Sequence, residues 1–243
     1  MYCAMEYWIK QFDIDGFRCD VADMVPTDFW VGVREKLDSI KKVFMLAEAD
    51  KNYIHQAFDM TYNWPLKDLM NDIAKGKKKA IDIKKYFENE KKEYDANDYR
   101  MVFTTNHDEN SWNGTEYERL GNGVKAFAAL CGTVKGMPLI YSGQEVGMDK
   151  RLRFFEKDTI VWKSSSLKDF YSKLNLLKEK NKALWNGSLG GEMQFIETGN
   201  DNVLAFVLQK GKNKVLAVFN LSAEKQTAKL KDNLIAGEYL SLF

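Results

Sequence analysis

The first three quarters of the chain alternate between short apolar runs and segments in which apolar residues recur with helical spacing. An apolar run of about four to eight residues between turn residues is typical of a buried strand, whereas recurrence every three or four residues is typical of a helix. Five runs predict strands, at residues 14–22, 43–49, 57–64, 100–108 and 137–145. Strands that alternate with helices indicate parallel βαβ units, so the pattern predicts an α/β fold.

Helical spacing marks the segments around these runs. The chain opens with one such segment, in which Met5, Trp8, Ile9 and Phe12 share a face. Because no capping residue precedes this helix, we expect the sequence to begin inside a longer protein. Later helical faces are made of Trp30, Val33, Leu37 and Ile40, of Val124, Phe127, Ala128 and Cys131, and of Phe170, Leu174 and Leu177.

The pattern changes near residue 190, where apolar runs follow one another with only turns between them. Three strands are predicted there, at residues 191–199, 202–211 and 213–222. Closely spaced strands with no room for helices are typical of an antiparallel sheet. We therefore expect two domains: an α/β domain at residues 1–188 and a small antiparallel all-β domain at residues 189–243.

Composition argues against several classes of partner. The chain has 36 Lys+Arg and 35 Asp+Glu, a net charge of +1, so no excess of positive charge attracts nucleic acid or an anionic membrane. No apolar run approaches the ~18–20 residues that cross a bilayer. Cys3, Cys19 and Cys131 lack metal-ligand spacing, and the last two are expected in the core. The sequence indicates no protein partner.

Charged residues interrupt the first predicted strand, in the stretch GFRCDVAD. Side chains alternate along a strand, so Arg18 and Asp20 share one face while Phe17 and Cys19 take the other. A charge in a buried strand costs several kcal/mol, about 3 or more, unless it is paired. We therefore expect Arg18 to neutralise and orient Asp20, either as a structural ion pair or as part of a site.

Three predicted strands end at a carboxylate: Asp20 after GFRC, Glu48 after VFMLA and Asp108 after MVFTTNH. In parallel α/β folds the catalytic groups lie at the carboxyl ends of the strands. Clustered carboxylates suit glycoside hydrolysis, which needs two of them with different tasks. Arg18 would keep Asp20 ionised as a nucleophile requires, and the apolar run before Glu48 suits a general acid.

A divalent-metal site built from Asp, Glu and His is the competing interpretation of these residues. The sequence contains only His55 and His107, with no His-x-x-x-His and no paired-Asp loop. We therefore rank a metal site below glycoside hydrolysis and assign no metal ligands.

The segments GFRCD, MLAE and TTNHD resemble, in order and spacing, three signature segments of the α-amylase family, glycoside hydrolase family 13. GMPLIYSGQEVG is similar to the eighth barrel strand of that family, and RFFEKDTIVW to the stretch that follows it. The resemblance implies a partial (β/α)8 TIM barrel, strands four to eight, followed by the family's C-terminal antiparallel β domain.

The resemblance also implies a retaining, double-displacement mechanism on α-linked glucans. Carried over by position, Asp20 is the nucleophile, Glu48 the acid/base and Asp108 the third carboxylate, while Arg18 and His107 line the same subsite. The implied substrates are starch, glycogen or malto-oligosaccharides, cleaved mainly at α-1,4 bonds. The chemistry requires no cofactor.

Three further substrate contacts are predicted near Asp108. Asn106 and His107 are expected to bind sugar hydroxyls. Trp112 follows Asp108 in a loop, where it either stacks on a sugar ring or packs against neighbouring residues.

The sequence departs from the family pattern at two points. No counterpart of the family's first signature segment is present, and that part of the family's fold also carries the inserted domain that binds structural calcium in many members. Asp23 and Met24 stand where many α-amylases have Lys-His. Because the first part of the barrel is missing, the sheet would have two open edges. We therefore expect the chain alone to be inactive and prone to aggregate.

Two alternatives to an α-glucan hydrolase stay open. A transglycosylase or isomerase of the same family would use the same three carboxylates. A non-catalytic glucan-binding or scaffold protein of the same fold would not need all three, so the presence of Asp20, Glu48 and Asp108 argues against it.

Overall fold

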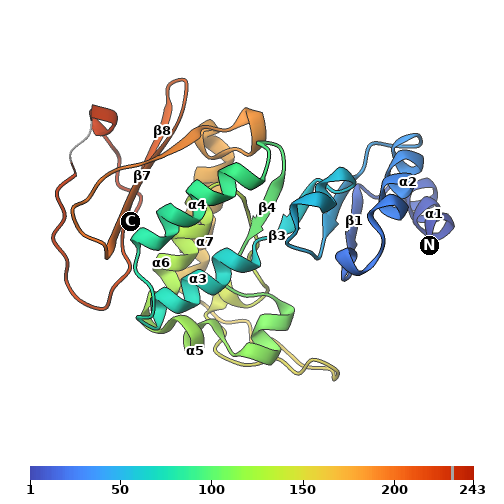
Figure 1. The fold of residues 1–243 in the computed structure, drawn as a ribbon. Coiled ribbons are helices and arrows are strands. Elements are labelled where there is room, and N and C mark those ends of the chain that lie inside the picture. Colours follow the sequence, from blue (N-terminus) through green and yellow to red (C-terminus); the bar gives the residue numbers. More distant parts are fainter. Residues whose placement is uncertain (231–232) are drawn as a thin grey trace.

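The computed structural model describes residues 1–230 and 233–243, and within them it contains two sheets (Figure 1). Five parallel strands form the first sheet in the order β1-β2-β3-β4-β5, and three antiparallel strands form the second in the order β6-β7-β8. The strands are β1 (Gly16–Cys19), β2 (Phe44–Ala47), β3 (Met60–Tyr62), β4 (Tyr99–Val102), β5 (Met137–Pro138), β6 (Glu192–Phe195), β7 (Val203–Lys210) and β8 (Asn213–Asn220). The predicted α/β fold with an antiparallel sheet at its end is confirmed.

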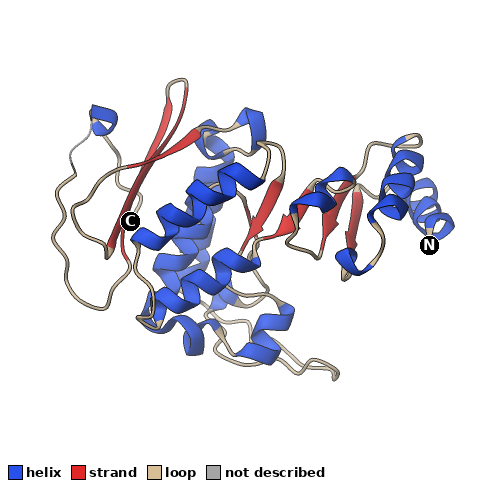
Figure 2. Ribbon diagram, viewed as in Figure 1, coloured by secondary structure: helices blue, strands red, loops and turns tan. Residues whose placement is uncertain are grey.

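Helices connect the parallel strands and cover the sheet, as Figure 2 shows by colour. The α-helices are α1 (Tyr2–Phe12), α2 (Thr27–Asp38), α3 (Trp64–Ala74), α4 (Ile81–Glu93), α5 (Glu116–Leu120), α6 (Val124–Thr133) and α7 (Ser166–Lys180). A π-helical turn, η3, spans Glu109–Asn113, and 3-10 turns lie at Ala22–Met24, Asn52–Gln56, Gly121–Gly123, Gln144–Val146, Lys182–Leu184, Gly187–Leu189 and Asn233–Ile235. Among the described residues, no helix has the length and apolar character of a membrane span.

The parallel strands are shorter than the apolar runs that predicted them, because each ladder ends where its partner strand ends. Tyr62, the last residue of β3, pairs with Met101, and Pro138, the last residue of β5, pairs with Val102. The chain after Val102 therefore leaves the sheet and enters the loop that carries Asp108.

The first helix only partly follows its predicted face. Met5 and Ile9 are buried in one core cluster with residues of α2 and β2, but Trp8 and Phe12 are 48% and 57% exposed. Figure 1 shows α1 at the outer end of the molecule beside α2. Helix α2 covers only the side of α1 that carries Met5 and Ile9, so Trp8 and Phe12 stay exposed.

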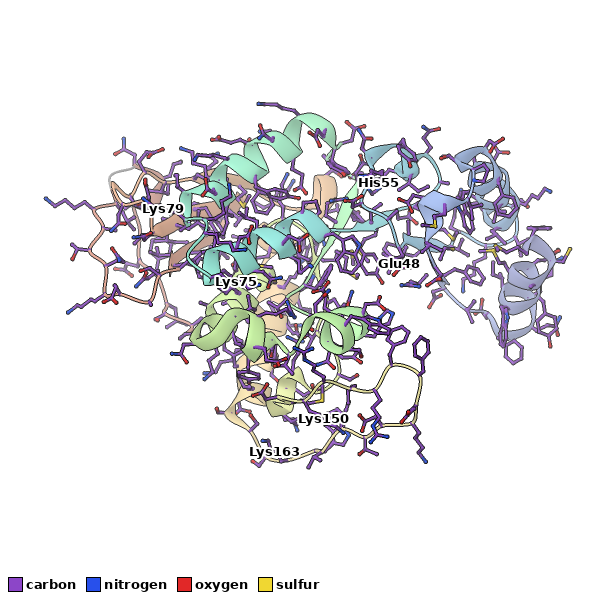
Figure 3. All side chains as sticks on the ribbon, turned by 60° about the horizontal axis from the view of Figure 1, so that its bottom comes forward. Glu48, His55, Lys75, Lys79, Lys150 and Lys163 are labelled. Carbon is purple, nitrogen blue, oxygen red and sulfur yellow. The ribbon has the colours of Figure 1, made fainter. Side chains whose placement is uncertain are left out.

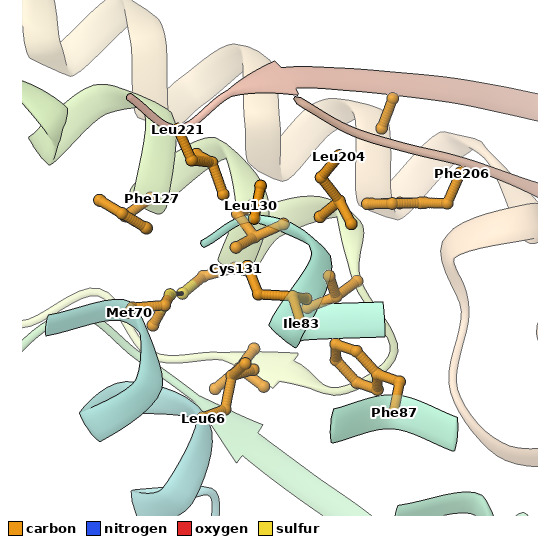
Figure 4. Packing of buried hydrophobic residues seen from close by; sticks show 14 of the residues in the cluster. Leu66, Met70, Ile83, Phe87, Phe127, Leu130, Cys131, Leu204, Phe206 and Leu221 are labelled. Atoms are coloured by element: carbon orange, nitrogen blue, oxygen red, sulfur yellow. Dashed lines mark hydrogen bonds between the residues drawn. The ribbon is translucent and has the colours of Figure 1, made fainter. Parts of the chain in front are cut away.

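The largest core lies between the helices and the antiparallel sheet (Figure 4). Leu66, Ile83 and Leu130, from α3, α4 and α6, share this cluster with Leu204 and Phe206 of β7. Burial of these apolar side chains attaches the antiparallel sheet to the α/β part. The proposed domain boundary between residues 188 and 189 stays a prediction.

Candidate active site

All five parallel strands point the same way, so the residues that follow them gather at one edge of the sheet. Asp20 follows β1 directly, Glu48 follows β2, and Asp108 follows β4 after a short loop. Figure 3 turns this side of the molecule forward and labels Glu48 on it. The sheet therefore brings the three predicted carboxylates to the same face.

Strands β1 and β2 approach each other closely at the start of the GFRCD segment. Gly16 pairs with Phe44, and a Cβ atom on Gly16 would meet the carbonyl oxygen of Phe44 at 1.8 Å. Only glycine fits there without a shift of the backbone. This pairing places Arg18 opposite Leu46, so that Asp20 and Glu48 emerge from adjacent strands.

Arg18 joins the two carboxylates that emerge from β1 and β2. Its Nη1 pairs with Oδ1 of Asp20, and its Nη2 lies 2.7 Å from Oε1 of Glu48. Its Nε donates a hydrogen bond of 3.2 Å to the hydroxyl of Tyr62 on β3. The predicted Arg18–Asp20 pair is confirmed, and the same guanidinium also holds Glu48.

These contacts set the charge of Asp20. The hydrogen bond from Arg18 lowers the pKa of Asp20 below its ordinary value, and the neighbouring carboxyl group of Glu48 acts in the same direction. The positive charge of Arg18 and that of His107 lower the pKa further. With its side chain 78% exposed, Asp20 is an ionised and accessible carboxylate at neutral pH.

Glu48 has polar partners rather than the apolar surroundings that its sequence neighbours indicated. Besides the Arg18 pair, its Oε2 accepts a hydrogen bond of 2.8 Å from the backbone N–H of Val21. Val21 has φ of 37°, a left-handed conformation that is rare for a β-branched residue. The strained turn after Asp20 is thus held by the Glu48 side chain, which is only 14% exposed.

Asp108 forms the other side of the site. Its Oδ2 lies 3.2 Å from Nε2 of His107, and the two side chains are 29% and 48% exposed. The charge of Asp108 also contributes to raising the pKa of Tyr62, after burial and the charge of Glu48. The sequence predicts that Tyr62, an aromatic residue near the strand ends, either stacks on a sugar ring or packs against neighbouring helices; in the structure its hydroxyl binds Arg18 and its pKa is influenced by Asp108.

Two other predicted substrate contacts have different environments. Asn106 is 1% exposed, and its Oδ1 accepts a hydrogen bond of 2.8 Å from the N–H of Glu109. Among the residues that the structure describes, none forms a hydrogen bond with its Nδ2. Trp112, on the π-helical turn η3, is 55% exposed and contacts Phe154 and Phe155.

Buried charges support the segment that carries Asp108. Glu109 is 4% exposed; its Oε1 lies 2.9 Å from Nζ of Lys67, and its Oε2 lies 3.8 Å from Nη1 of Arg119. Both cations are also buried. The start of η3 is thereby fixed to α3 and α5, directly after the catalytic candidate.

A second buried group lies beneath the site around Gln144. Its Nε2 donates to Thr104, Glu116 and Tyr171 at 2.7 to 3.0 Å. Gln144 therefore has a structural role.

His55 also has structural partners: its two ring nitrogens form hydrogen bonds with the Phe58 carbonyl and the Thr61 hydroxyl. In the part of the chain that the structure describes, no group of three or more His, Cys, Asp or Glu side chains is placed to hold a metal ion.

Comparison with known proteins extends this description. The family model described as "Alpha amylase, catalytic domain" matches residues 1–183. A cyclomaltodextrinase of Thermoanaerobacter pseudethanolicus is 26% identical over 98% of this chain and 44% of its own length, and a maltogenic alpha-amylase of Bacillus acidopullulyticus is 27% identical over 92% and 42%.

A solved structure shares the fold. The noncanonic maltogenic alpha-amylase AmyB from Thermotoga neapolitana has a TM-score of 0.86 and 29% identity, over 97% of this chain and 55% of its own. The chain thus spans about half the length of the relatives that it matches. The matched family model covers the five parallel strands and all three carboxylates, and the chain belongs to the alpha-amylase family.

Proposed function

We propose that this chain carries the active-site carboxylates of a retaining glycoside hydrolase that cleaves α-glucosidic bonds, mainly α-1,4, in starch, glycogen or malto-oligosaccharides. The observation that carries the proposal is the shared guanidinium of Arg18, which binds Asp20 and Glu48 at once. Retaining glycosidases need two neighbouring carboxyl groups, one as nucleophile and one as acid/base.

Asp20 is the proposed nucleophile, since its lowered pKa keeps it ionised and its side chain is open to solvent. In the first step a carboxylate oxygen of Asp20 attacks the anomeric carbon, while Glu48 gives a proton to the departing glycosidic oxygen. In the second step Glu48 takes a proton from water, and the resulting hydroxide equivalent displaces Asp20. Every atom in these steps comes from the glucan, water and the two side chains.

Asp108 is the proposed third carboxylate, with His107 beside it. A carboxylate there stabilises the positive charge that develops on the sugar in the oxocarbenium-like transition state. The names of the relatives, cyclomaltodextrinase and maltogenic alpha-amylase, favour short or cyclic malto-oligosaccharides as substrates.

Replacement of the nucleophile tests this function. The longest product of its gene is assayed on maltoheptaose, because the 243-residue chain alone is expected to be inactive. Asp20→Asn should lower turnover by about a thousandfold or more and leave the circular-dichroism spectrum unchanged. Asp28→Asn, which changes an exposed acid in the first turn of α2, is the matched control and should keep its activity.

The products separate the competing interpretations. Proton NMR should detect the α-anomer first, because two displacements retain configuration. Early release of the β-anomer, or most of the activity surviving in folded Asp20→Asn, would contradict the assignment of Asp20. Products longer than the substrate would indicate a transglycosylase.

A further inference from the structure

Three neighbouring strands each bring one polar group to the guanidinium of Arg18. Two of these groups are the carboxylates that follow β1 and β2, and the third is the hydroxyl of Tyr62, the last residue of β3. Leu46 of β2 pairs with Arg18 on one side and with Met60 of β3 on the other. Tyr62 lies two residues beyond Met60, so its side chain is on the face of the sheet that carries Arg18. The register of the strands therefore places this hydroxyl beside the arginine.

The ring of Tyr62 is held by two other aromatic side chains. It is stacked on Trp64, with centroids 5.3 Å apart and planes inclined by 19°, and Phe103 meets it edge-on at 5.7 Å. Trp64 and Phe103 also contact each other, at 5.0 Å. Offset and edge-on contacts of this kind are the preferred arrangements of aromatic rings. With only 4% of its surface exposed, Tyr62 offers little of its ring to a sugar, and its hydroxyl is fixed in position by the core.

Each of the three nitrogens of the Arg18 guanidinium has a different partner. Nη1 pairs with Asp20, Nη2 lies 2.7 Å from Glu48, and Nε donates a hydrogen bond of 3.2 Å to Tyr62. A guanidinium is planar, and its N–H donors point in fixed directions. When Nε is bound to a hydroxyl that cannot move, the plane of the group is set, and with it the directions in which Nη1 and Nη2 reach the two carboxylates.

The hydroxyl of Tyr62 is a neutral partner for this arginine. Burial raises the pKa of Tyr62 above its ordinary value, although the hydrogen bond from Arg18 and the positive charge of Arg18 oppose the rise. Tyr62 is therefore uncharged at neutral pH and orients the guanidinium without neutralising it. The whole positive charge stays available to the two carboxylates, whereas an acidic side chain in place of Tyr62 would compete with them for it.

We propose that Tyr62 is a positioning residue: its hydroxyl fixes the plane of the Arg18 guanidinium, so that Arg18 holds Asp20 and Glu48 together in the arrangement that the reaction requires. The inference rests on the proposed function and adds to it a residue that acts through Arg18 rather than on the sugar. Positioning of this kind lowers the barrier of the chemical step, because the charged groups need no rearrangement as the reaction proceeds.

Tyr62→Phe tests this role, because it removes the hydroxyl and keeps the packed ring. In the longest product of the gene, assayed on maltoheptaose, kcat should fall by about tenfold, the loss typical of one hydrogen bond to a charged group. KM should change by less than about twofold, since Tyr62 is not proposed to contact the sugar. Carbon NMR of the aspartate-labelled 243-residue chain should show the pKa of Asp20 rising toward its ordinary value, but by less than in Arg18→Gln.

Tyr171→Phe is the matched control for the loss of a buried tyrosine hydroxyl. Tyr171 is 6% exposed, and its hydroxyl accepts a hydrogen bond of 3.0 Å from Nε2 of Gln144 instead of from Arg18. This variant should leave kcat and the titration of Asp20 unchanged, even where it lowers the thermal stability as much as Tyr62→Phe does.

Nitrogen NMR of the unaltered chain tests the same hydrogen bond without any substitution. The Nε–H of Arg18 should exchange with water at least about tenfold more slowly than that of Arg153, whose pair with Glu156 is exposed. Equal exchange rates would overturn the inference, and this measurement decides the matter if Tyr62→Phe does not fold.

Three further results would overturn it: an unchanged kcat and an unchanged pKa of Asp20 in folded Tyr62→Phe, equal losses in Tyr62→Phe and Tyr171→Phe, or a change in KM alone, which would indicate direct contact with the sugar. If the pKa of Asp20 rises as expected but the unaltered protein hydrolyses no glucan, Tyr62 positions Arg18 and the proposed function fails. If glucan hydrolysis is equally fast with and without the hydroxyl, the proposed function stands and the role of Tyr62 fails.

Discussion

Two regions of the chain supply the carboxylates, and they hold them in different ways. Asp20 and Glu48 depend on one arginine near the surface: Asp20 is 78% exposed and Arg18 29%. The segment of Asp108 instead rests on buried charges, since the side chains of Glu109 and Lys67 are 5% and 7% exposed. Substitutions in the Arg18 region should therefore change activity with little effect on the fold. Substitutions that disturb the buried charges behind Asp108 should lower the free energy of unfolding as well as activity.

The apolar packing differs in the same direction. Residues 1–58 form their own core cluster and expose Trp8 and Phe12 on α1. The later helices share one larger cluster with the antiparallel sheet. Residues from β7 such as Phe206, fully buried in that cluster, therefore stabilise the framework on which Asp108 is carried.

Loss of the buried lysine should have the largest effect on stability. Lys67→Met leaves Glu109 with a weakened set of partners in the interior, which should cost about 3–5 kcal/mol of unfolding free energy. Chemical denaturation measures the change. Lys10→Met, in the exposed pair with Glu6, is the control and should change stability far less.

A double variant sharpens this result. Lys67→Met combined with Glu109→Leu removes both charges, so part of the lost stability should return. If Lys67→Met costs no more than Lys10→Met, the buried network does not support the Asp108 segment as described.

Arg18→Lys should affect the reaction more than the fold. A lysine presents a single ammonium and cannot bind two carboxylates and Tyr62 in the planar geometry of a guanidinium, so kcat/KM should fall by about a hundredfold. The same change in Arg153, whose pair with Glu156 is exposed, should leave maltotriose hydrolysis intact. A loss of global stability as large as that of Lys67→Met would remove the contrast between the two regions.

The sequence predicted the Arg18 half of the site because its information is local. Alternation along one strand places Arg18 and Asp20 on the same face, and the structure pairs them there. The five parallel strands were predicted for a similar reason, since short apolar runs are visible without knowledge of contacts. Their ends were less predictable, because the partner strand decides where each ladder stops.

The Asp108 half was less accessible to sequence reasoning. Lys67 and Glu109 are 42 residues apart in the chain, and no spacing rule pairs them. For the same reason the sequence did not indicate that Asn106 is buried or that Tyr62 binds Arg18. The exposure of Phe154 and Phe155 likewise depends on the fold around their loop.

A smaller effect is expected from Glu116, in the buried region. Burial raises its pKa, although hydrogen bonds from Thr104 and Gln144 oppose this. The folded state then holds the proton more tightly, so the stabilisation is complete below the unfolded pKa of about 4.3 and is lost as the pH rises through the folded value. Denaturation between about pH 4 and 7 should show a shallower decline in Glu116→Gln than in the unaltered chain.

The exposed Glu88→Gln on α4 is the control for Glu116 and should leave the pH dependence as it is. Identical pH profiles for Glu116→Gln and the unaltered chain would show that Glu116 is not a buried, destabilising charge at neutral pH. The contrast with the exposed Asp20 would then be lost.

The most direct test of the account is the titration of Asp20 itself, because the account has Arg18 bind this carboxylate and favour its ionised form. Carbon NMR of the aspartate-labelled chain, assigned with Asp20→Asn, gives its pKa without any need for turnover. The account predicts a midpoint below the ordinary value of about 3.9, and a rise toward that value in Arg18→Gln. A midpoint at or above the ordinary value, unchanged in Arg18→Gln, would contradict it.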